Sequence, residues 1–444
     1  MSEIGGRVVY VVRSFPRLSQ TFILNELLAL EALGINISVI SLVRADERLT
    51  HERLARLRAP VVYLDERRGS LIGLVVPHLR LFGRRPLGYL RAAWRLARQP
   101  EATLGYHGVT RRQAFDLGVV AALEIGVHRR HHGVARIHAH FAHDPALVAL
   151  IVGDLSGVPF SFTGHARDLV QISPRALGAR VEAARAVVTC CAMNADLLRA
   201  VSGSEDHGKV AVIRHGIDVE AFVPPPDSST RRRGAVASVG RMIDKKGFEV
   251  LIDAVAQVVG SGDPVHLTIY GDGPLQATLA ARIAAAELDD HVMLAGECTQ
   301  SELQRLLPTY ALFALTPHVS DDGDRDGLPT VLVEAMACGL PVVTTDVAGI
   351  PDLVEHGVNG IMCPPRQVAP VSAALRMLLA DDDRRERMGV AARATVIAGF
   401  NAAITSRRVA DLLLDRSPDG PRRAGRRTAR RGAGRAPECA GPPA

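Results

Sequence analysis

The chain has 444 residues, 47% of them apolar, which is enough for two or three domains with hydrophobic cores of their own and excludes a largely disordered protein. Its formal net charge is +6, but residues 416–444 hold eight Arg and two acidic residues, so residues 1–415 balance 45 basic against 45 acidic side chains. This balance excludes an argument from net charge for nucleic-acid binding, and no apolar run is long enough for a membrane-spanning helix.

The first elements predict a parallel α/β sheet. Residues 7–12 and 35–42 are apolar runs typical of strands, and residues 22–33 between them form an amphipathic helix. Short links between strand, helix and strand favour parallel pairing. The loop after the first strand lies where open α/β sheets bind ligands, but it lacks G-x-G-x-x-G, so we expect no dinucleotide there. This loop contains Pro16, Ser19, Gln20 and Thr21.

Residues 44–135 give a weaker pattern. A strand is predicted near residues 60–64 and helices near 71–82 and 88–98. The stretch 78–98 combines Leu, Phe, Tyr89 and Trp94 with six Arg. It fits ordinary amphipathic helices packed on the sheet, and it also fits a surface that meets a membrane.

A histidine-rich segment follows. His138 and His140 alternate on a predicted strand, so both point to one face. The segment has no partner Cys and no ordered ligand spacing, and we therefore predict no metal. A helix over 146–156 and a strand over 158–163 lead to Gly164-His165-Ala166-Arg167-Asp168, directly at the ligand-binding edge of the sheet.

A second α/β unit begins after a Pro-rich linker. Its first strand, residues 236–239, delivers a loop with Gly240, Arg241, Lys245 and Lys246 before a helix that starts at Phe248. The chain has three Lys against fifty Arg, and two of the three are in this loop. A compact ammonium in so Arg-rich a chain indicates anion binding. We expect Arg241 and Lys246 to clamp a diphosphate and Lys245 to be solvated.

The stretch 326–341, DGLPTVLVEAMACGLP, organises the second half. Asp326 lies on a loop, and Glu334 lies one turn inside a helix predicted over residues 330–338, which ends before Gly339. A helix N-terminus suits a phosphate, and neighbouring carboxylates accept hydrogen bonds from hydroxyls. Together these features describe a site for a nucleotide sugar.

With the signature Arg214-His215-Gly216-Ile217-Asp218, these motifs resemble the retaining GT-B-fold glycosyltransferases that build bacterial polysaccharides. The resemblance covers nearly all of residues 1–415. It departs from the family at Asp326, where Glu is usual. It implies two Rossmann-like α/β domains with parallel sheets facing a central cleft. The implied boundaries are an acceptor-side domain over 1–223, a linker over 224–233, a donor domain over 234–398, a helix crossing back over 399–415, and an unfolded tail over 416–444.

The resemblance also implies roles for individual residues. It makes Asp326, Glu334 and His165 the catalytic residues. Donor binding is assigned to Gly240, Arg241, Lys246, Gly271, Gly273, Gly327, Leu328, Pro329, Thr330 and Glu334. Acceptor-side roles are assigned to Pro16, Ser19, Gln20, Thr21, His140 and Asp168. Asp322-Gly323-Asp324 matches the D-x-D of metal-dependent glycosyltransferases, but those have another fold, so we predict no metal and no cofactor.

The predicted function is transfer of a hexosyl-type sugar from a nucleotide-diphosphate sugar to a glycan or lipid-linked oligosaccharide, in polysaccharide biosynthesis. We expect a cytoplasmic enzyme with reduced cysteines, associated with the inner face of the membrane and not with nucleic acid. Asp326 leaves open a weakly active or non-catalytic nucleotide-sugar-binding homologue, because Asp is one methylene shorter than Glu. A GT-B epimerase or phosphorylase and an NAD-dependent dehydrogenase are the further alternatives.

Overall fold

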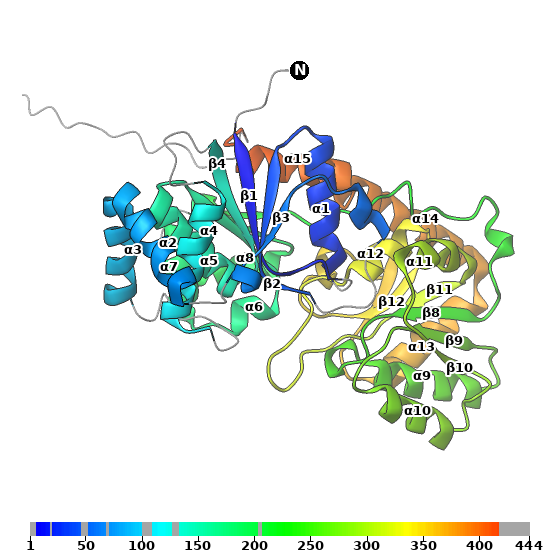
Figure 1. Ribbon diagram of the computed structural model, residues 1–444. Helices are drawn as coiled ribbons and strands as arrows, with labels where there is room; N and C mark the ends of the chain where they lie inside the picture. Colours follow the sequence, from blue (N-terminus) through cyan, green and yellow to red (C-terminus); the bar gives the residue numbers. More distant parts are fainter. Residues whose placement is uncertain are drawn as a thin grey trace, which may run out of the picture.

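The computed structural model describes residues 6–17, 20–45, 52–67, 71–99, 109–126, 133–202 and 207–416. Two α/β domains lie side by side, each built around one parallel sheet (Figure 1). Ser19 and the tail from residue 417 onwards lie outside the described residues. No described helix combines the length and the apolar character needed to cross a bilayer.

The N-terminal domain has a seven-stranded sheet with helices on both faces. Its strands are β1 (Arg7–Phe15), β2 (Ile37–Arg44), β3 (Val61–Tyr63), β4 (Val134–His140), β5 (Phe160–Gly164), β6 (Ala186–Thr189) and β7 (Val210–Val212). Its helices are α1 (Thr21–Ala32), α2 (Leu71–Arg84), α3 (Pro86–Arg98), α4 (Arg111–Glu124), α5 (Asp144–Ser156), α6 (Arg167–Val170), α7 (Pro174–Ala183) and α8 (Ala192–Val201).

Alternate residues of β1 feed two separate hydrophobic cores. Val9 and Val11 pack with α4 and α5 on one face of the sheet. Val8, Tyr10 and Val12 pack with α1 on the other face. The strand order is β3-β2-β1-β4-β5-β6-β7 with all pairs parallel. A parallel strand covered on both faces must be apolar throughout, which is why β1 gives a continuous apolar run in the sequence.

The C-terminal domain repeats this plan with six parallel strands in the order β10-β9-β8-β11-β12-β13. Its strands are β8 (Ala235–Val239), β9 (His266–Tyr270), β10 (Val292–Gly296), β11 (Leu312–Ala314), β12 (Val342–Thr345) and β13 (Gly360–Cys363). Its helices are α9 (Phe248–Gly260), α10 (Gln276–Ala285), α11 (Gln300–Leu306), α12 (Thr330–Ala337), α13 (Val368–Ala380) and α14 (Asp382–Gly399).

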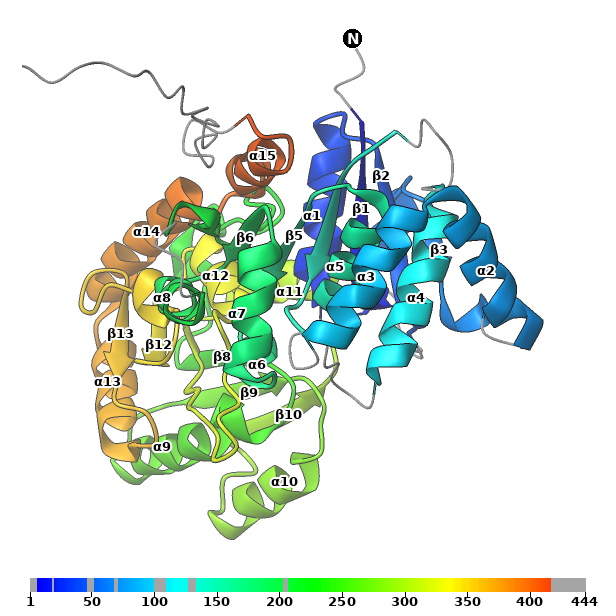
Figure 2. The same cartoon turned by 90° about the vertical axis from the view of Figure 1, so that its left-hand side faces the viewer.

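The last helix, α15 (Ala402–Leu413), belongs by its packing to the first domain. Val409 and Leu413 are buried in the same core as Tyr10 of β1, and both views show α15 next to α1 (Figures 1 and 2). The buried Arg136 side chain of β4 donates a hydrogen bond to the Leu413 carbonyl at 3.0 Å. The chain therefore ties its two domains together twice, through the segment before β8 and through α15.

Candidate active site

A cavity of about 650 Å³ lies between the domains, at the carboxyl ends of both sheets. Of the described residues that line it, two are acidic, Asp168 and Asp326, and seven are basic. This excess of positive charge in a cleft attracts anionic ligands. A second cavity, of about 770 Å³, lies at the opposite edge of the first sheet, bordered by Gly6 and Gly133, where parallel sheets do not bind ligands. The cationic residues of the cleft are Arg13, Arg17, Arg167, Arg241, Lys245, Lys246 and Arg325.

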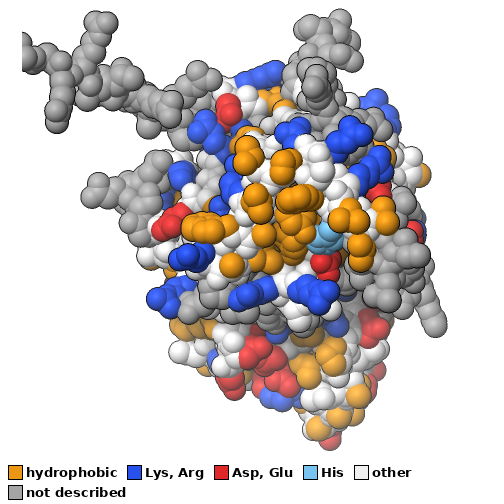
Figure 3. All heavy atoms as spheres, turned by 60° about the vertical axis from the view of Figure 1, so that its left-hand side comes forward, with side chains coloured by type: hydrophobic (Ala, Val, Ile, Leu, Met, Phe, Trp, Pro, Cys, Tyr) orange, Lys and Arg blue, Asp and Glu red, His pale blue; other side chains and the backbone are white. Residues whose placement is uncertain are grey.

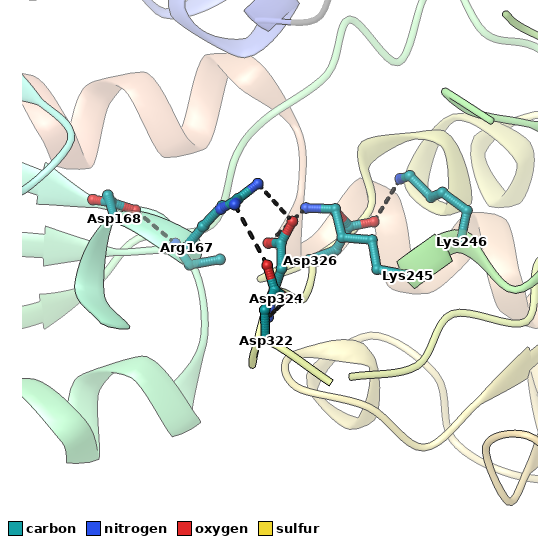
Figure 4. Close-up of polar contacts among 8 residues, drawn as sticks. Arg167, Asp168, Lys245, Lys246, Asp322, Asp324 and Asp326 are labelled. Atoms are coloured by element: carbon teal, nitrogen blue, oxygen red, sulfur yellow. Dashed lines mark hydrogen bonds and ion pairs between the residues drawn. The ribbon is translucent and has the colours of Figure 1, made fainter. Parts of the chain in front are cut away.

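Two lysines hold the carboxylate of Asp326. Lys246 Nζ lies 2.5 Å from Asp326 Oδ2, and Lys245 Nζ lies 3.2 Å from Oδ1 (Figure 4). The expectation that Lys245 is solvated is wrong, because its side chain is 14% exposed and also lies 3.1 Å from Asp324 Oδ1. Burial alone would raise the pKa of Asp326, but the charges of Lys246 and Lys245 outweigh it and hold the pKa below its ordinary value.

The D-x-D carboxylates link the two domains. Arg167 Nη1 of α6 lies 3.1 Å from Asp324 Oδ2, and Arg167 Nη2 lies 3.5 Å from Asp322 Oδ2 (Figure 4). Asp324 is buried and thus joins Arg167 of the first domain to Lys245 of the second. Arg167 and Lys245 thus compensate the charges of these two carboxylates.

Arg241 follows β8, lines the cleft and is exposed. Glycines bring the neighbouring loop close to it: Gly271 has φ +134°, and a Cβ there would lie 2.0 Å from the Gly240 carbonyl oxygen. This close approach of the two backbones leaves no room for a side chain at Gly271, in the loop after β9. Gly240 and Gly273 belong to the same pair of loops, with Met242 N donating to the Asp272 carbonyl at 2.8 Å.

The loop before α12 also lies on the cavity wall, since Gly327, Leu328, Pro329 and Thr330 line it. Glu334 lies one turn further, buried on the side of α12 that faces α11, where its Oε1 accepts a hydrogen bond from Gln300 Nε2 at 3.1 Å. Burial raises the pKa of Glu334 to about 7, and the Gln300 hydrogen bond opposes this. Asp326 lines the cavity, whereas Glu334 is not among the described residues that line it.

Asp168 anchors the loop that carries His165. Its carboxylate accepts hydrogen bonds from the backbone N–H groups of Ala142 at 2.7 Å, Ala166 at 2.9 Å and His165 at 3.0 Å. Burial raises the pKa of Asp168 and these backbone hydrogen bonds oppose the rise. The carboxylate is thus turned into the loop backbone, which makes it a positioning group although it borders the cleft.

Three imidazoles form a row behind the cleft wall. His140 Nδ1 lies 3.1 Å from His165 Nε2, and His165 Nδ1 lies 3.1 Å from His215 Nε2. Glu26 Oε1 completes the row 3.3 Å from His140 Nε2, and it accepts a hydrogen bond from the Tyr10 hydroxyl at 2.8 Å. Burial lowers the pKa of His165 well below its usual value and that of His215 to about 4. His165 and His215 reach the cavity, whereas His140 is fully buried.

One cluster among the described residues has metal-ligand geometry: Glu26, His138 and His140. His138 is already satisfied, because its Nδ1 lies 2.8 Å from the Ser161 hydroxyl and its Nε2 lies 3.0 Å from the Thr163 hydroxyl. Both hydroxyls and the Glu26 carboxylate explain the cluster as a buried hydrogen-bond network.

The acceptor-side loop after β1 contributes differently from what was expected. Gln20 lines the cavity, while Pro16 and Thr21 flank it at the ends of β1 and α1. Arg13 and Arg17 of the same segment line the cavity and were missed. Arg325 was missed too, and its buried Nε has no hydrogen-bond partner among the described residues. Arg is so common in this chain that its presence in a loop carries little signal.

Comparison with known proteins gives consistent matches. Residues 228–395 match the family model for glycosyl transferases group 1. The chain is 37% identical over 205 residues to the amylovoran biosynthesis glycosyltransferase AmsK of Erwinia amylovora, covering 46% of this chain and 50% of AmsK. It is 28% identical over 417 residues to the putative colanic acid biosynthesis glycosyltransferase WcaL of Escherichia coli K12, covering 92% of this chain and 99% of WcaL.

The fold also matches solved structures. The crystal structure of Anabaena Alr3699/HepE in complex with UDP superposes with a TM-score of 0.68 at 17% identity, covering 92% of this chain and 100% of that one. A UDP-glucose complex of the same protein gives a TM-score of 0.67. At this identity the likeness shows the fold alone, which is GT-B, as the sequence predicted.

Proposed function

Because this chain belongs to the group 1 glycosyltransferases, with relatives in exopolysaccharide biosynthesis, we propose that it moves a hexosyl-type sugar from a nucleotide-diphosphate sugar to a glycan or lipid-linked acceptor. We propose further that it retains the anomeric configuration, needs no metal or cofactor, and works at the inner face of the membrane. The observation that carries the proposal is the cationic cleft, with its seven basic side chains beside the start of α12.

The proposed chemistry is the departure of a nucleotide diphosphate from the anomeric carbon. Arg241, Lys246 and Lys245 lie where they would neutralise charge that develops on the leaving phosphate oxygens. Asp326 would accept a hydrogen bond from a sugar hydroxyl, and Glu334 would accept one from a ribose hydroxyl. Complexes of HepE with UDP and UDP-glucose support a donor of this class.

The test is a thermal-shift screen of UDP and GDP sugars, with and without EDTA. A ligand at 100 times its Kd stabilises by about 2.7 kcal/mol, so binding raises the unfolding midpoint. Lys246→Ala should weaken donor binding roughly 10- to 100-fold, the value of a charged hydrogen bond. Lys209→Ala is the matched control, because that lysine is half-buried and donates a hydrogen bond to the Glu182 carbonyl, away from the cleft.

A midpoint insensitive to every nucleotide sugar would reject the proposal, and a shift abolished by EDTA would reject metal independence. The anomeric configuration of the product, assigned by NMR, tests whether the configuration is retained.

A second candidate, a binding homologue without transfer, is favoured by one observation: Lys246, which was expected to hold the diphosphate, pairs with Asp326, and so does Lys245. Donor binding without transfer or hydrolysis would establish it.

A further inference from the structure

Helices α2 and α3 form the outer layer of the N-terminal domain, and each carries apolar side chains both on its inner side and on its outer side. The inner face is ordinary: Leu81 and Ala92 are buried in the core with α4 and α5. Arg95 also points inward, with its guanidinium paired to Asp154 of α5. The outer face holds seven of the seventeen exposed large apolar side chains of the described residues, within 20 positions. They are Val75, Val76, Leu79, Phe82, Leu87, Leu90 and Trp94, which we call the apolar face.

The spacing shows that the apolar face is a surface and not a scatter of single residues. Leu87, Leu90 and Trp94 are separated by three and four positions, which places them on one stripe of α3. They are 82%, 55% and 57% exposed. Figure 3 shows apolar side chains gathered on this side of the molecule. Amphipathic helices packed on a sheet turn such a stripe inward, so packing on the domain explains the inner faces of α2 and α3 but not the outer ones.

The charge around the apolar face selects its partner. Residues 71–98 contain six Arg and no acidic residue. Arg80, Arg84 and Arg98 are exposed, whereas the guanidinium of Arg91 pairs with Asp154 of α5. Figure 3 shows basic side chains bordering the apolar ones. Arg side chains at such a border keep the guanidinium in the headgroup region while their stems cover apolar surface. Apolar side chains with Trp on one stripe and Arg beside it match a helix lying in the interface of an anionic bilayer.

We propose that the outer face of α2 and α3 is a docking surface for a membrane that contains acidic phospholipids. It deepens the proposed function, since it rests on a lipid-linked acceptor as the reason for docking. Vesicle binding is measured without donor or acceptor, however. The docking proposal can therefore be rejected while the transferase activity is retained, and the activity can be rejected while docking is retained.

The chain offers a specific probe, because Trp94 is its single tryptophan. Full-length protein is titrated with vesicles of phosphatidylcholine, with and without phosphatidylglycerol. Tryptophan emission should shift to the blue only with the vesicles that contain phosphatidylglycerol. The Arg-rich residues 416–444 can also attract acidic lipid, but binding through them would leave Trp94 in water. Tryptophan emission therefore distinguishes binding through the apolar face from binding through residues 416–444.

Leu87→Ser with Leu90→Ser should weaken vesicle binding by about tenfold or more, since burying one such side chain gives about that factor. Arg84→Gln with Arg98→Gln should weaken binding to acidic vesicles severalfold. Val390→Ser is the control, because Val390 is 68% exposed on α14 and should bind normally. An unchanged Trp94 emission, or an equal shift with neutral vesicles, overturns the proposal. The proposal is also overturned if the wild type sediments as a dimer and the variant with Leu87→Ser and Leu90→Ser sediments as a monomer. The apolar face would then be an interface between two copies of the chain.

Discussion

Asp326 is held by Lys246, which the family resemblance assigns to a diphosphate, and by Lys245, which was expected to be solvated. Lys245 and Lys246 are each less than 15% exposed on the side chain, so their charges depend on carboxylates for compensation. Lys246 pairs with Asp326, and Lys245 pairs with both Asp326 and Asp324. A diphosphate that enters the cleft competes for the same ammonium groups. Its arrival would release Asp326 to accept a hydrogen bond from a sugar hydroxyl, which links donor binding to the activation of this carboxylate.

Asp326→Ala separates these two roles. Turnover should fall by about 100-fold or more, the usual cost of removing one preorganised polar group from a transition state. Affinity for UDP or GDP should stay equal or increase, because the lysines lose their competing carboxylate. Steady-state kinetics and calorimetric titration measure the two quantities. Near-normal turnover would remove Asp326 from the mechanism, and a parallel loss of nucleotide binding would make it a structural group.

Glu334 predicts a pH dependence of stability. Its pKa is raised from 4.5 to about 7 in the folded chain, so between these values the unfolded state loses a proton that the folded state keeps. The folded protein is then penalised as pH rises through this window, by about 3 kcal/mol at pH 8. Glu334→Gln should remove the penalty and exceed the wild type in urea stability at pH 8, with the gap shrinking towards pH 5. The exposed Glu220→Gln should show no such trend, and a gap independent of pH would contradict the assignment.

At the scale of elements, β4 and β5 with the segment after β7 assemble the histidine row, and α1 closes it with Glu26. Each residue comes from a different element, so no local motif links them in the sequence. Burial would raise the pKa of Glu26, but His140 and His138 outweigh it and lower the pKa to about 2. The depressed pKa contributes stability that is present above 4.5 and is lost as pH falls towards 2.

Glu26→Gln should therefore lower the free energy of unfolding at pH 7 and bring the variant closer to the wild type at pH 3. It should also lower transfer, because the carboxylate fixes which nitrogen of His140 carries a proton and, through it, the orientation of His165. Urea unfolding at both pH values and a pH profile of turnover test the two effects. A stability loss with unchanged turnover would restrict Glu26 to the fold.

The sequence predicted most elements because their patterns are local. β9 over residues 266–270 and the loop–helix stretch around α12 occur as expected, since buried strands and helix stop signals are readable from neighbours. α4 was missed, although Thr110 and Gln113 form a capping box that its spacing could have disclosed. The pairing of Lys245 with Asp326 could not be predicted, because two loops about 80 residues apart make it.

For the whole molecule, the described structure is one in which the two domains touch through their site loops. Ala192 N of α8 donates to Asp352 Oδ2 at 2.8 Å, and Arg167 pairs with Asp324 across the cleft. These polar contacts are partly exposed, as expected for an interface between domains that separate to admit substrates. The domains approach most closely at two glycines, Gly327 against the His165 backbone and Gly349 against the Cys191 side chain.

Gly327→Ala tests whether this approach is needed for activity. A Cβ at Gly327 would lie 2.3 Å from the His165 carbonyl oxygen and 3.0 Å from Cys190 Sγ, so the domains must move apart to relieve the clash. Since a misplacement of about 1 Å at a reacting centre costs about 100-fold, turnover should fall by that order while each domain stays folded. Gly260→Ala, at the end of α9 with open space around its Cβ, should be active and slightly more stable. Small-angle scattering should show a larger radius of gyration for Gly327→Ala alone, and normal turnover in that variant would mean that catalysis does not require the contact between the Gly327 loop and His165.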